Sequence, residues 1–250
     1  MKKISIALFC STILICGCIC SGKTNPCDVN IGSHAAVTPA PRNDQDWWMP
    51  RHNAILERIK KGNVDLIMIG DSITHYWEEP GKQVWDQYYA KRNAVNMGFS
   101  GDKTEHVLWR LQNGEIDGIN PKLAVLMIGT NNSDGDYYTA EQIADGIKAI
   151  VCQLRTKLPN TKVLILAIFP RGEKPSPQRQ KNEQASELAS KIADNKWIYY
   201  LDINSKFLEK DGFTLSKKIM PDLLHPQQKG YKIWAQAMEP TIIKLMGEKK

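Results

Sequence analysis

Five short runs of apolar residues recur along the chain, and polar residues rarely interrupt them. A continuous apolar run that is rich in β-branched residues is typical of a strand covered on both faces of a parallel sheet. We therefore expect a buried strand at each run. The five predicted strands are Val64–Ile69, Ala94–Met97, Leu123–Ile128, Val163–Ile168 and Trp197–Leu201.

The stretches between these runs carry apolar residues at a helical spacing. A helix is predicted from Pro50 onward, with Ala54, Ile55 and Ile59 on one face. Four further helices are predicted at Thr104–Gln112, Ala140–Lys157, Pro177–Ala193 and Pro226–Met246. Strands that alternate with helices in this way predict an α/β fold with a parallel sheet and helices on both of its sides.

The first twenty residues differ from the rest of the chain. Lys2 and Lys3 precede an apolar run over 4–15, which is short for a membrane-spanning helix. A basic start before a short apolar run is typical of an export signal, so residues 1–20 are interpreted as one. The run ends in Ile15-Cys16-Gly17-Cys18, which resembles the lipobox of bacterial lipoproteins. This resemblance implies cleavage before Cys18 and a lipid anchor on it; the alternative is a plain secretory peptide that is cut slightly later.

The organisation after the signal is simple. Residues 21–45 mix Ser, Gly, Thr, Asn and Pro with few apolar residues, which predicts a tether. One domain is predicted over 46–250, and the bulky pair Trp47-Trp48 would attach the tether to it. We expect the protein outside the cytoplasm, as a cell-envelope lipoprotein in the periplasm or on the surface, or as a secreted protein.

Composition, charge and cysteine spacing argue against a nucleic-acid partner and against a metal site. The 250 residues are 42% hydrophobic and 24% charged, which is ordinary for one globular α/β domain. Loss of residues 1–17 would remove two lysines and no acids, so the charge would fall from +6 to 31 − 27 = +4. This excess is spread along the chain, which argues against a nucleic-acid partner. No cysteine pair lies near a histidine pair, so no metal site is predicted, and Cys152 is interpreted as a small buried apolar residue.

Four segments place polar residues and glycines after predicted strands or before the last helix. They are Gly70-Asp71-Ser72, Gly98-Phe99-Ser100-Gly101, Gly129-Thr130-Asn131-Asn132 and Asp222-Leu223-Leu224-His225. Functional groups in open α/β sheets gather at the carboxyl ends of the strands. We therefore expect these segments to meet at one edge of the sheet.

Ser72 is the candidate nucleophile. A serine hydroxyl attacks poorly until a neighbouring base takes its proton. Gly70 permits a tight exit from the preceding strand, and a following helical turn would direct backbone N–H groups at the site. By itself this pattern is weak, because a serine after Gly-Asp is more often a helix N-cap.

His225 is the candidate base among five histidines. Asp222 precedes it by three residues, and Pro226 fixes the chain as it enters a helix. One local turn can bring the carboxylate to the imidazole, where it would hold the tautomer and stabilise the imidazolium. A simple capping role for both residues at the final helix is the open alternative.

A serine hydrolase also needs donors for the oxyanion that forms on the substrate carbonyl. Gly101 can offer a backbone N–H in a conformation that other residues adopt reluctantly. Asn131 can offer a side-chain amide, and the N–H of Ser72 is a third donor. Each residue taken alone is more typical of a turn.

Together these residues resemble the SGNH hydrolases, also called the GDSL esterase/lipase family, over residues 47–245. The resemblance implies a serine esterase with Ser72 as nucleophile, Asp222 and His225 as its acid–base pair, and Gly101, Asn131 and Ser72 as oxyanion donors. Ile73 stands where the family name has leucine, which keeps an apolar side chain. Asn132 stands where many members have aspartate, which is not one of the four catalytic positions.

Within that family, several segments resemble the catalytic subunits of platelet-activating factor acetylhydrolase and their bacterial relatives. They are Pro50-Arg51-His52, Val64-Asp65-Leu66-Ile67, Trp77 and Phe169-Pro170-Arg171-Gly172-Glu173. The likeness implies a flavodoxin-like three-layer α/β/α sandwich with a mainly parallel five-stranded sheet, short acyl substrates such as acetyl esters, and a homodimer. Bacterial relatives commonly deacetylate sugars, so O-acetylated carbohydrate is the expected substrate.

Two further residues are candidates for substrate binding. Trp77 could line the acyl pocket or lie in the core, and Arg171 could bind an anionic group or pair with nearby carboxylates such as Glu173. No metal or organic cofactor is expected. The alternatives to a carbohydrate acetylesterase are a lysophospholipase, a thioesterase, a phospholipid acetylhydrolase or a non-catalytic glycan-binding lipoprotein.

Overall fold

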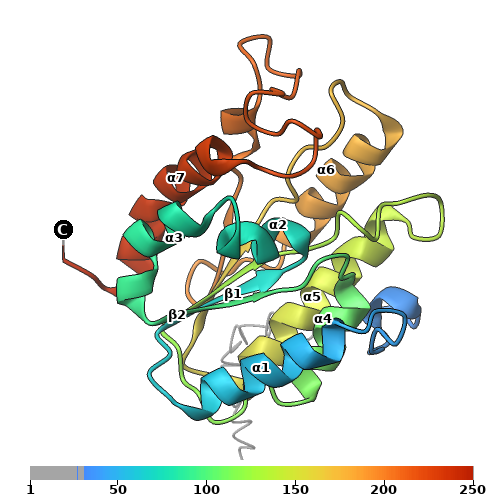
Figure 1. The fold of residues 1–250 in the computed structure, drawn as a ribbon. Coiled ribbons are helices and arrows are strands. Elements are labelled where there is room, and N and C mark those ends of the chain that lie inside the picture. The colour runs from blue at the N-terminus through green and yellow to red at the C-terminus, as the bar shows by residue number, and fades with distance from the viewer. Residues whose placement is uncertain (1–26, 28–30, 250) are drawn as a thin grey trace, which may run out of the picture.

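A computed structural model describes Cys27 and residues 31–249 of the chain. It contains a five-stranded parallel sheet in the order β2-β1-β3-β4-β5, with helices on both faces (Figure 1). The strands are β1 (Leu66–Gly70), β2 (Ala94–Gly98), β3 (Leu123–Met127), β4 (Lys162–Leu166) and β5 (Ile198–Leu201). The predicted α/β sandwich is therefore confirmed, and each predicted run overlaps its strand. The strand order is that of flavodoxin-like folds.

Seven α-helices surround the sheet in the described part of the chain. They are α1 (Trp48–Lys60), α2 (Ser72–His75), α3 (Lys82–Tyr88), α4 (Thr104–Gln112), α5 (Ala140–Lys157), α6 (Pro177–Ser190) and α7 (Gln228–Met246), with 3₁₀-helices at Ala35–Val37, Tyr76–Glu78, Ala90–Arg92 and Asn204–Phe207. On α1, the buried residues include His52 beside Ile55 and Ile59, whereas Ala54 is exposed. None of the described helices is long and apolar enough to cross a membrane.

The two faces of the sheet are covered by separate hydrophobic cores. Successive residues of β1 point to opposite faces, so Ile67 joins one core and Met68 joins the other. The core on the Ile67 face contains residues of α1, α4, α5 and α6, and the core on the Met68 face contains residues of α2, α3 and α7 (Figure 1). Because both faces are covered, all five residues of β1 and of β3 are buried.

The segment 31–47, here called the N-terminal strap, lies against the domain. Ala36 is fully buried, and its carbonyl accepts a hydrogen bond of 2.8 Å from Oγ1 of Thr104. Gly146 on α5 permits this approach, because a Cβ there would lie 2.8 Å from the Ala36 oxygen. The structure therefore corrects the prediction of a tether over 21–45 for its described part. Hydrogen bonds and the small buried residue Ala36 hold the strap, and neither leaves a periodic hydrophobic pattern in the sequence.

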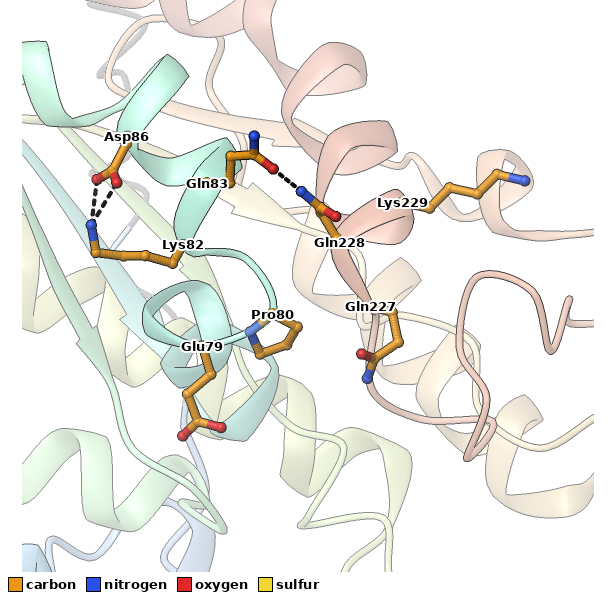
Figure 2. Close-up of a pocket in the computed structure, with 8 residues that line it drawn as sticks. All are labelled: Glu79, Pro80, Lys82, Gln83, Asp86, Gln227, Gln228 and Lys229. Atoms are coloured by element: carbon orange, nitrogen blue, oxygen red, sulfur yellow. Dashed lines mark hydrogen bonds and ion pairs between the residues drawn. The ribbon is translucent and has the colours of Figure 1, made fainter.

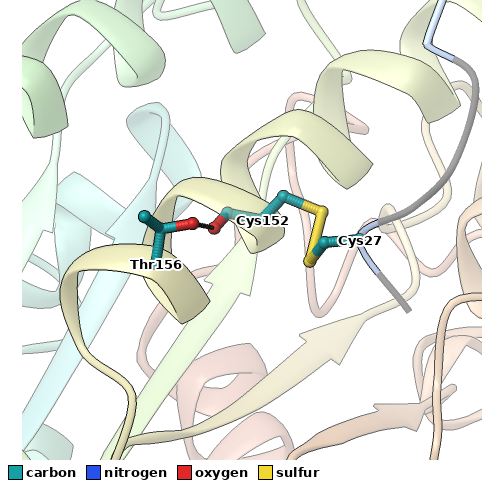
Figure 3. Close-up of a disulfide and its surroundings, with 3 residues drawn as sticks. All are labelled: Cys27, Cys152 and Thr156. Carbon is teal, nitrogen blue, oxygen red and sulfur yellow. Dashed lines mark hydrogen bonds between the residues drawn. A yellow bond between two sulfur atoms is a disulfide. The ribbon is translucent and has the colours of Figure 1, made fainter. Parts of the chain in front are cut away.

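A disulfide joins Cys27 to Cys152 on α5, across 125 residues of sequence (Figure 3). The prediction that Cys152 is a small buried apolar residue is therefore wrong. Its side chain is only partly buried and points from α5 toward Cys27. The predicted export signal and the lipid site at Cys18 lie outside the described residues.

Candidate active site

The candidate residues meet at the carboxyl edge of the sheet. Ser72 follows β1, Gly101 follows β2 and Asn131 follows β3, while His225 comes from the loop before α7. The chain leaves β1 for β2 on one side and then crosses to β3 on the other side. Such a switch in strand order leaves a crevice where open α/β sheets bind their ligands.

A tight turn between β1 and α2 presents Ser72. Gly70 is required there, because a Cβ would overlap the side chain of Thr74 and the carbonyl oxygen of Met127. Asp71 is the N-cap of α2, and its Oδ1 accepts a hydrogen bond of 3.0 Å from the Ile73 N–H. The capping role that a Gly-Asp-Ser turn suggests thus belongs to Asp71. It leaves the Ser72 hydroxyl available, although this residue is only 7% exposed.

The hydroxyl of Ser72 lies 2.9 Å from Nε2 of His225. On the other side of the ring, Nδ1 lies 2.6 Å from Oδ2 of Asp222. The second oxygen of Asp222 accepts hydrogen bonds from the backbone N–H groups of His225 (2.7 Å) and Leu224 (3.0 Å). Leu223 in this turn has a φ of 61°, an uncommon conformation for a branched side chain. The turn thus fixes the carboxylate and the imidazole against each other.

The environment keeps Asp222 ionised. Partial burial works to raise its pKa, but hydrogen bonds from the backbone and ring of His225 outweigh that effect and lower the pKa below its usual value. An ionised carboxylate holds the Nδ1–H tautomer of the ring, so Nε2 is free to accept the serine proton.

Three candidate hydrogen-bond donors lie at the carboxyl edge of the sheet, each in the loop after a different strand. The N–H groups of Ser72 and Gly101 donate to no other residue in the described part of the chain. Gly101 has a φ of 77°, which favours glycine. Asn131 donates one amide hydrogen to the carbonyl of Asp102 at 2.9 Å, and the second hydrogen stays available. The arrangement can therefore receive a developing oxyanion.

The two further candidates for substrate binding both have partners within the protein. Trp77 is fully buried, with its ring 4.5 Å from that of Tyr231 and 4.8 Å from that of Trp234, so its assignment to the pocket is corrected to the core. The aromatic ring beside the base is that of Tyr76, 5.1 Å from His225. Arg171 bonds Oδ1 of Asp134 at 2.9 Å, which joins the loops after β3 and β4.

A buried charged network behind Gly101 escaped the sequence analysis. Arg110 donates to Oδ2 of Asp102 at 2.9 Å and to Glu115 at 2.5 Å, and Glu115 contacts Nδ1 of His52 at 2.9 Å. Trp48 donates to the other oxygen of Asp102 at 2.7 Å. Burial raises the pKa of Asp102 to about 6, although Arg110 opposes the shift. The only signal in the sequence is the position of Asp102 directly after Gly101.

No group of three or more His, Cys, Asp or Glu residues in the described chain is arranged to hold a metal ion. A polar hollow lies between the start of α3 and the start of α7 (Figure 2). Its lining residues are Glu79, Pro80, Lys82, Gln83, Asp86, Gln227, Gln228 and Lys229. Gln83 and Gln228 are hydrogen-bonded across it, and Gln227 follows His225 by two residues.

Comparison with known proteins gives consistent matches. Residues 68–233 match the GDSL-like lipase/acylhydrolase family. The chain is 36% identical over 233 residues to platelet-activating factor acetylhydrolase IB subunit alpha2 of Homo sapiens, covering 91% of this chain and 94% of that protein. It is 34% identical over 232 residues to the human alpha1 subunit, with the same coverage. The acetylxylan esterase Axe2 of Geobacillus stearothermophilus shares the fold, with a TM-score of 0.58, 18% identity, and coverage of 75% of this chain and 96% of that chain.

Proposed function

We propose that this chain removes short acyl groups, and acetyl groups in particular, from carbohydrates. The chain belongs to the GDSL-like lipase/acylhydrolase family and is an ester hydrolase of the SGNH/GDSL type. The observation that carries the proposal is the 2.9 Å contact between Ser72 and His225, which are 153 residues apart in sequence. This contact gives an otherwise weak nucleophile its base.

In the proposed mechanism, Oγ of Ser72 attacks the ester carbonyl while Nε2 of His225 takes its proton. The oxyanion accepts hydrogen bonds from the N–H groups of Ser72 and Gly101 and from the amide of Asn131. Collapse of the tetrahedral intermediate breaks the ester bond, and His225 returns the proton to the leaving alcohol. Water, activated by the same imidazole, then hydrolyses the acyl-enzyme and restores Ser72. Asp222 keeps its charge throughout and stabilises the imidazolium.

The surroundings of Ser72 support a carbohydrate. A sugar presents both an apolar ring face and many hydroxyl groups, and aromatic side chains combine an apolar face with a polar edge. Tyr76 lies beside His225, and the partly exposed Trp47 stands 5.9 Å from the ring of His75. The polar hollow of Figure 2 includes Gln227, two residues after His225 in sequence, and carries amide, carboxylate and ammonium groups. These groups suit hydroxyls better than a long acyl chain.

An acetyl ester of a phospholipid is the second candidate substrate, favoured by the 36% identity to a platelet-activating factor acetylhydrolase subunit. Both candidates share the acetyl group and differ in the alcohol. A panel of acetylated xylan, acetylated sialic acid, a short-chain phospholipid ester and p-nitrophenyl esters of two to twelve carbons separates them. We expect the shortest acyl chain and an acetylated glycan to give the highest kcat/KM. Greater activity on the phospholipid ester would favour the second candidate.

The role of Ser72 is tested with Ser72→Ala and a fluorophosphonate probe, which labels only an activated serine. We expect the wild-type enzyme to be labelled and Ser72→Ala to remain unlabelled, with a loss of turnover of about 10⁶-fold as in other serine hydrolases. Ser190→Ala is a matched control, because Ser190 lies at the end of α6, where its hydroxyl donates to the carbonyl of Glu187. A folded Ser72→Ala variant that retains esterase activity would overturn the mechanism, and an unlabelled wild-type protein would point to a non-catalytic glycan-binding protein.

We also propose that the enzyme works outside the cytoplasm. The disulfide between Cys27 and Cys152 supports this location, because such bonds persist in oxidising compartments. Fractionation of cells that express the wild-type chain or Cys18→Ser tests the anchor. We expect the wild type in the membrane fraction and the variant in the soluble exported fraction. Identical partitioning would favour a plain secretory signal.

A further inference from the structure

The loop Gly98–Asp102, here called the oxyanion loop, is held through nearly all of its backbone groups. The Phe99 N–H donates to the carbonyl of Gly70 at 3.0 Å, and the Asp102 N–H donates to the carbonyl of Phe99 at 3.1 Å. Side chains hold further groups: Arg51 donates to the Gly98 carbonyl (2.8 Å), the Ser100 N–H donates to His75 (3.3 Å), and Arg42 donates to the Ser100 carbonyl (2.7 Å). The Gly101 N–H is left free for a ligand.

The bond from Arg42 acts on the peptide group that carries the Gly101 N–H. The Ser100 carbonyl and the Gly101 N–H belong to the same planar trans peptide, so they point in opposite directions. A donor that fixes the carbonyl therefore also fixes the direction of the N–H. Because the donor is a cation, the hydrogen bond is strong and polarises the peptide, which makes its N–H a better donor in turn.

The bond from Asp102 to Phe99 closes the turn around this peptide but does not touch its atoms, so Arg42 forms the one direct hydrogen bond to the peptide among the described residues. His75 holds the Ser100 N–H, which belongs to the preceding peptide, and the φ of Gly101 lies in the region where glycine is least restricted. The Arg42 side chain is 13% exposed and packs on the loop itself, because a Cβ at Gly101 would lie 2.6 Å from its Nη1. The guanidinium thus occupies the space beside the glycine.

We propose that Arg42 is a positioning residue for the oxyanion hole. The N-terminal strap carries Arg42 to the active site. The proposal rests on the proposed function, since it assigns Arg42 a role in that same site. The strap is fixed just before Arg42: Ala40 donates its N–H to the Glu105 carbonyl at 3.2 Å, and Ala36 is buried against Thr104. The disulfide at Cys27 attaches the chain before the strap to α5.

The variants Arg42→Ala and Arg42→Lys test this role, with p-nitrophenyl acetate as substrate. Loss of a whole oxyanion donor costs about 10²–10³-fold in turnover, and loss of its orientation should cost less. We expect Arg42→Ala to lower kcat about 10–100-fold with KM changed less than about twofold. Arg42→Lys keeps one cationic donor and should recover part of the loss. The rate of fluorophosphonate labelling should fall in parallel with kcat, because the same hole receives the phosphonyl oxygen.

Asp44→Ala is the matched control. Asp44 pairs with Arg42 at 3.3 Å but is 65% exposed and contacts no residue of the oxyanion loop. This variant removes the ion pair and keeps the bond to Ser100, so its kcat should stay within about twofold of the wild type. Thermal unfolding of all variants separates a loss of turnover from a loss of fold.

A double-mutant cycle with Asn131→Ala covers the case in which Arg42→Ala unfolds part of the strap. If Arg42 acts through the hole, the two losses in kcat combine to less than their product. Wild-type kcat in a folded Arg42→Ala, a rise in KM at constant kcat, or fully multiplicative losses would each overturn the inference. If Ser72→Ala is inactive while Arg42→Ala has full activity, only this inference fails. If Ser72→Ala stays active, the proposed function itself fails.

Discussion

The two sides of the active site are built in different ways. The base side is local: Asp222 and His225 are three residues apart, and one turn joins them, with the Asp222 side chain 56% exposed. The oxyanion side is assembled over long distances, because Asp102 bonds Trp48 from 54 residues earlier and Arg42 reaches Ser100 across 58 residues. Asp102 and Arg110 are fully buried there. The base pair therefore depends on its own turn, whereas the oxyanion hole depends on the whole fold.

Because of this difference, substitutions on the base side should lower mainly the turnover, and substitutions on the oxyanion side should lower mainly the stability. Replacing an exposed side chain in the turn that joins Asp222 and His225 removes an interaction that the reaction needs and leaves both hydrophobic cores intact. A change in the buried network removes support from several elements at once, since it connects α1, α4 and the oxyanion loop. Substitutions on the two sides should therefore give different ratios of lost turnover to lost stability.

Among the substitutions that compare the two sides, Asp222→Asn should produce the largest effect and leave the fold intact. The amide oxygen can still accept the backbone bonds from Leu224 and His225, but it no longer holds the Nδ1–H tautomer or stabilises the imidazolium. We expect kcat to fall about 10⁴-fold, as for the corresponding change in a serine protease. Steady-state kinetics and thermal unfolding of the same samples provide the test. A melting temperature that falls with the activity would show that this turn is structural support as well.

The same contrast explains what the sequence could reveal. The strands and the sheet were predictable because a parallel sheet covered on both faces leaves continuous apolar runs, and the helices α4 and α5 follow an amphipathic spacing. Asp222 and His225 were recognisable as a pair because their interaction is local. Ser72, Gly101 and Asn131 could be identified as candidates because each follows an apolar run in a pattern that resembles a known family.

The supports of the oxyanion loop were not recognisable from the sequence. Arg42 lies in a stretch whose composition predicts a tether, and nothing in that stretch encodes the backbone bond to Ser100. Trp77 follows Tyr76 directly, and only the turn of the short helix decides which ring faces His225 and which enters the core. The partner of Cys152 lies 125 residues away and leaves no periodic signal. In each case a contact between distant segments determines the role.

Arg110→Met should have the next largest effect, and it should act on stability. The substitution keeps an apolar stem but leaves the buried carboxylates of Asp102 and Glu115 without their shared cation. Removing one partner of a buried ion pair costs about 3–5 kcal/mol. The loss of unfolding free energy is measured by urea denaturation at neutral pH.

Lys82→Met is the matched comparison, because Lys82 forms an exposed ion pair with Asp86. Such a pair contributes about 0–1 kcal/mol, so the two variants should differ by several kcal/mol. Similar losses in both would mean that the buried network does not support the oxyanion side as the structure indicates.

Asp71→Asn should give the smallest effect, and one that depends on pH. Asp71 lies where the two sides meet, directly before Ser72, with its Oδ2 buried and unpaired among the described residues. Burial raises its pKa to about 7, hydrogen bonding from Ile73 opposes the shift, and the charge of Asp102 adds to it. The folded state therefore holds a proton that the unfolded chain releases near pH 4, so this carboxyl costs stability as the pH rises from about 4 to about 7.

Asparagine carries no such proton, and its side-chain oxygen can still accept the Ile73 N–H. The stability of Asp71→Asn relative to the wild type should therefore increase with pH through this window and level off above pH 7. Each pH unit contributes at most about 1.4 kcal/mol, and the expected difference between pH 5 and pH 8 is about 1–3 kcal/mol. Urea unfolding of both proteins at pH 5, 6.5 and 8 measures it. A constant difference across these pH values would mean that Asp71 is ionised in the folded enzyme, which would place a permanent negative charge between the nucleophile and the oxyanion loop.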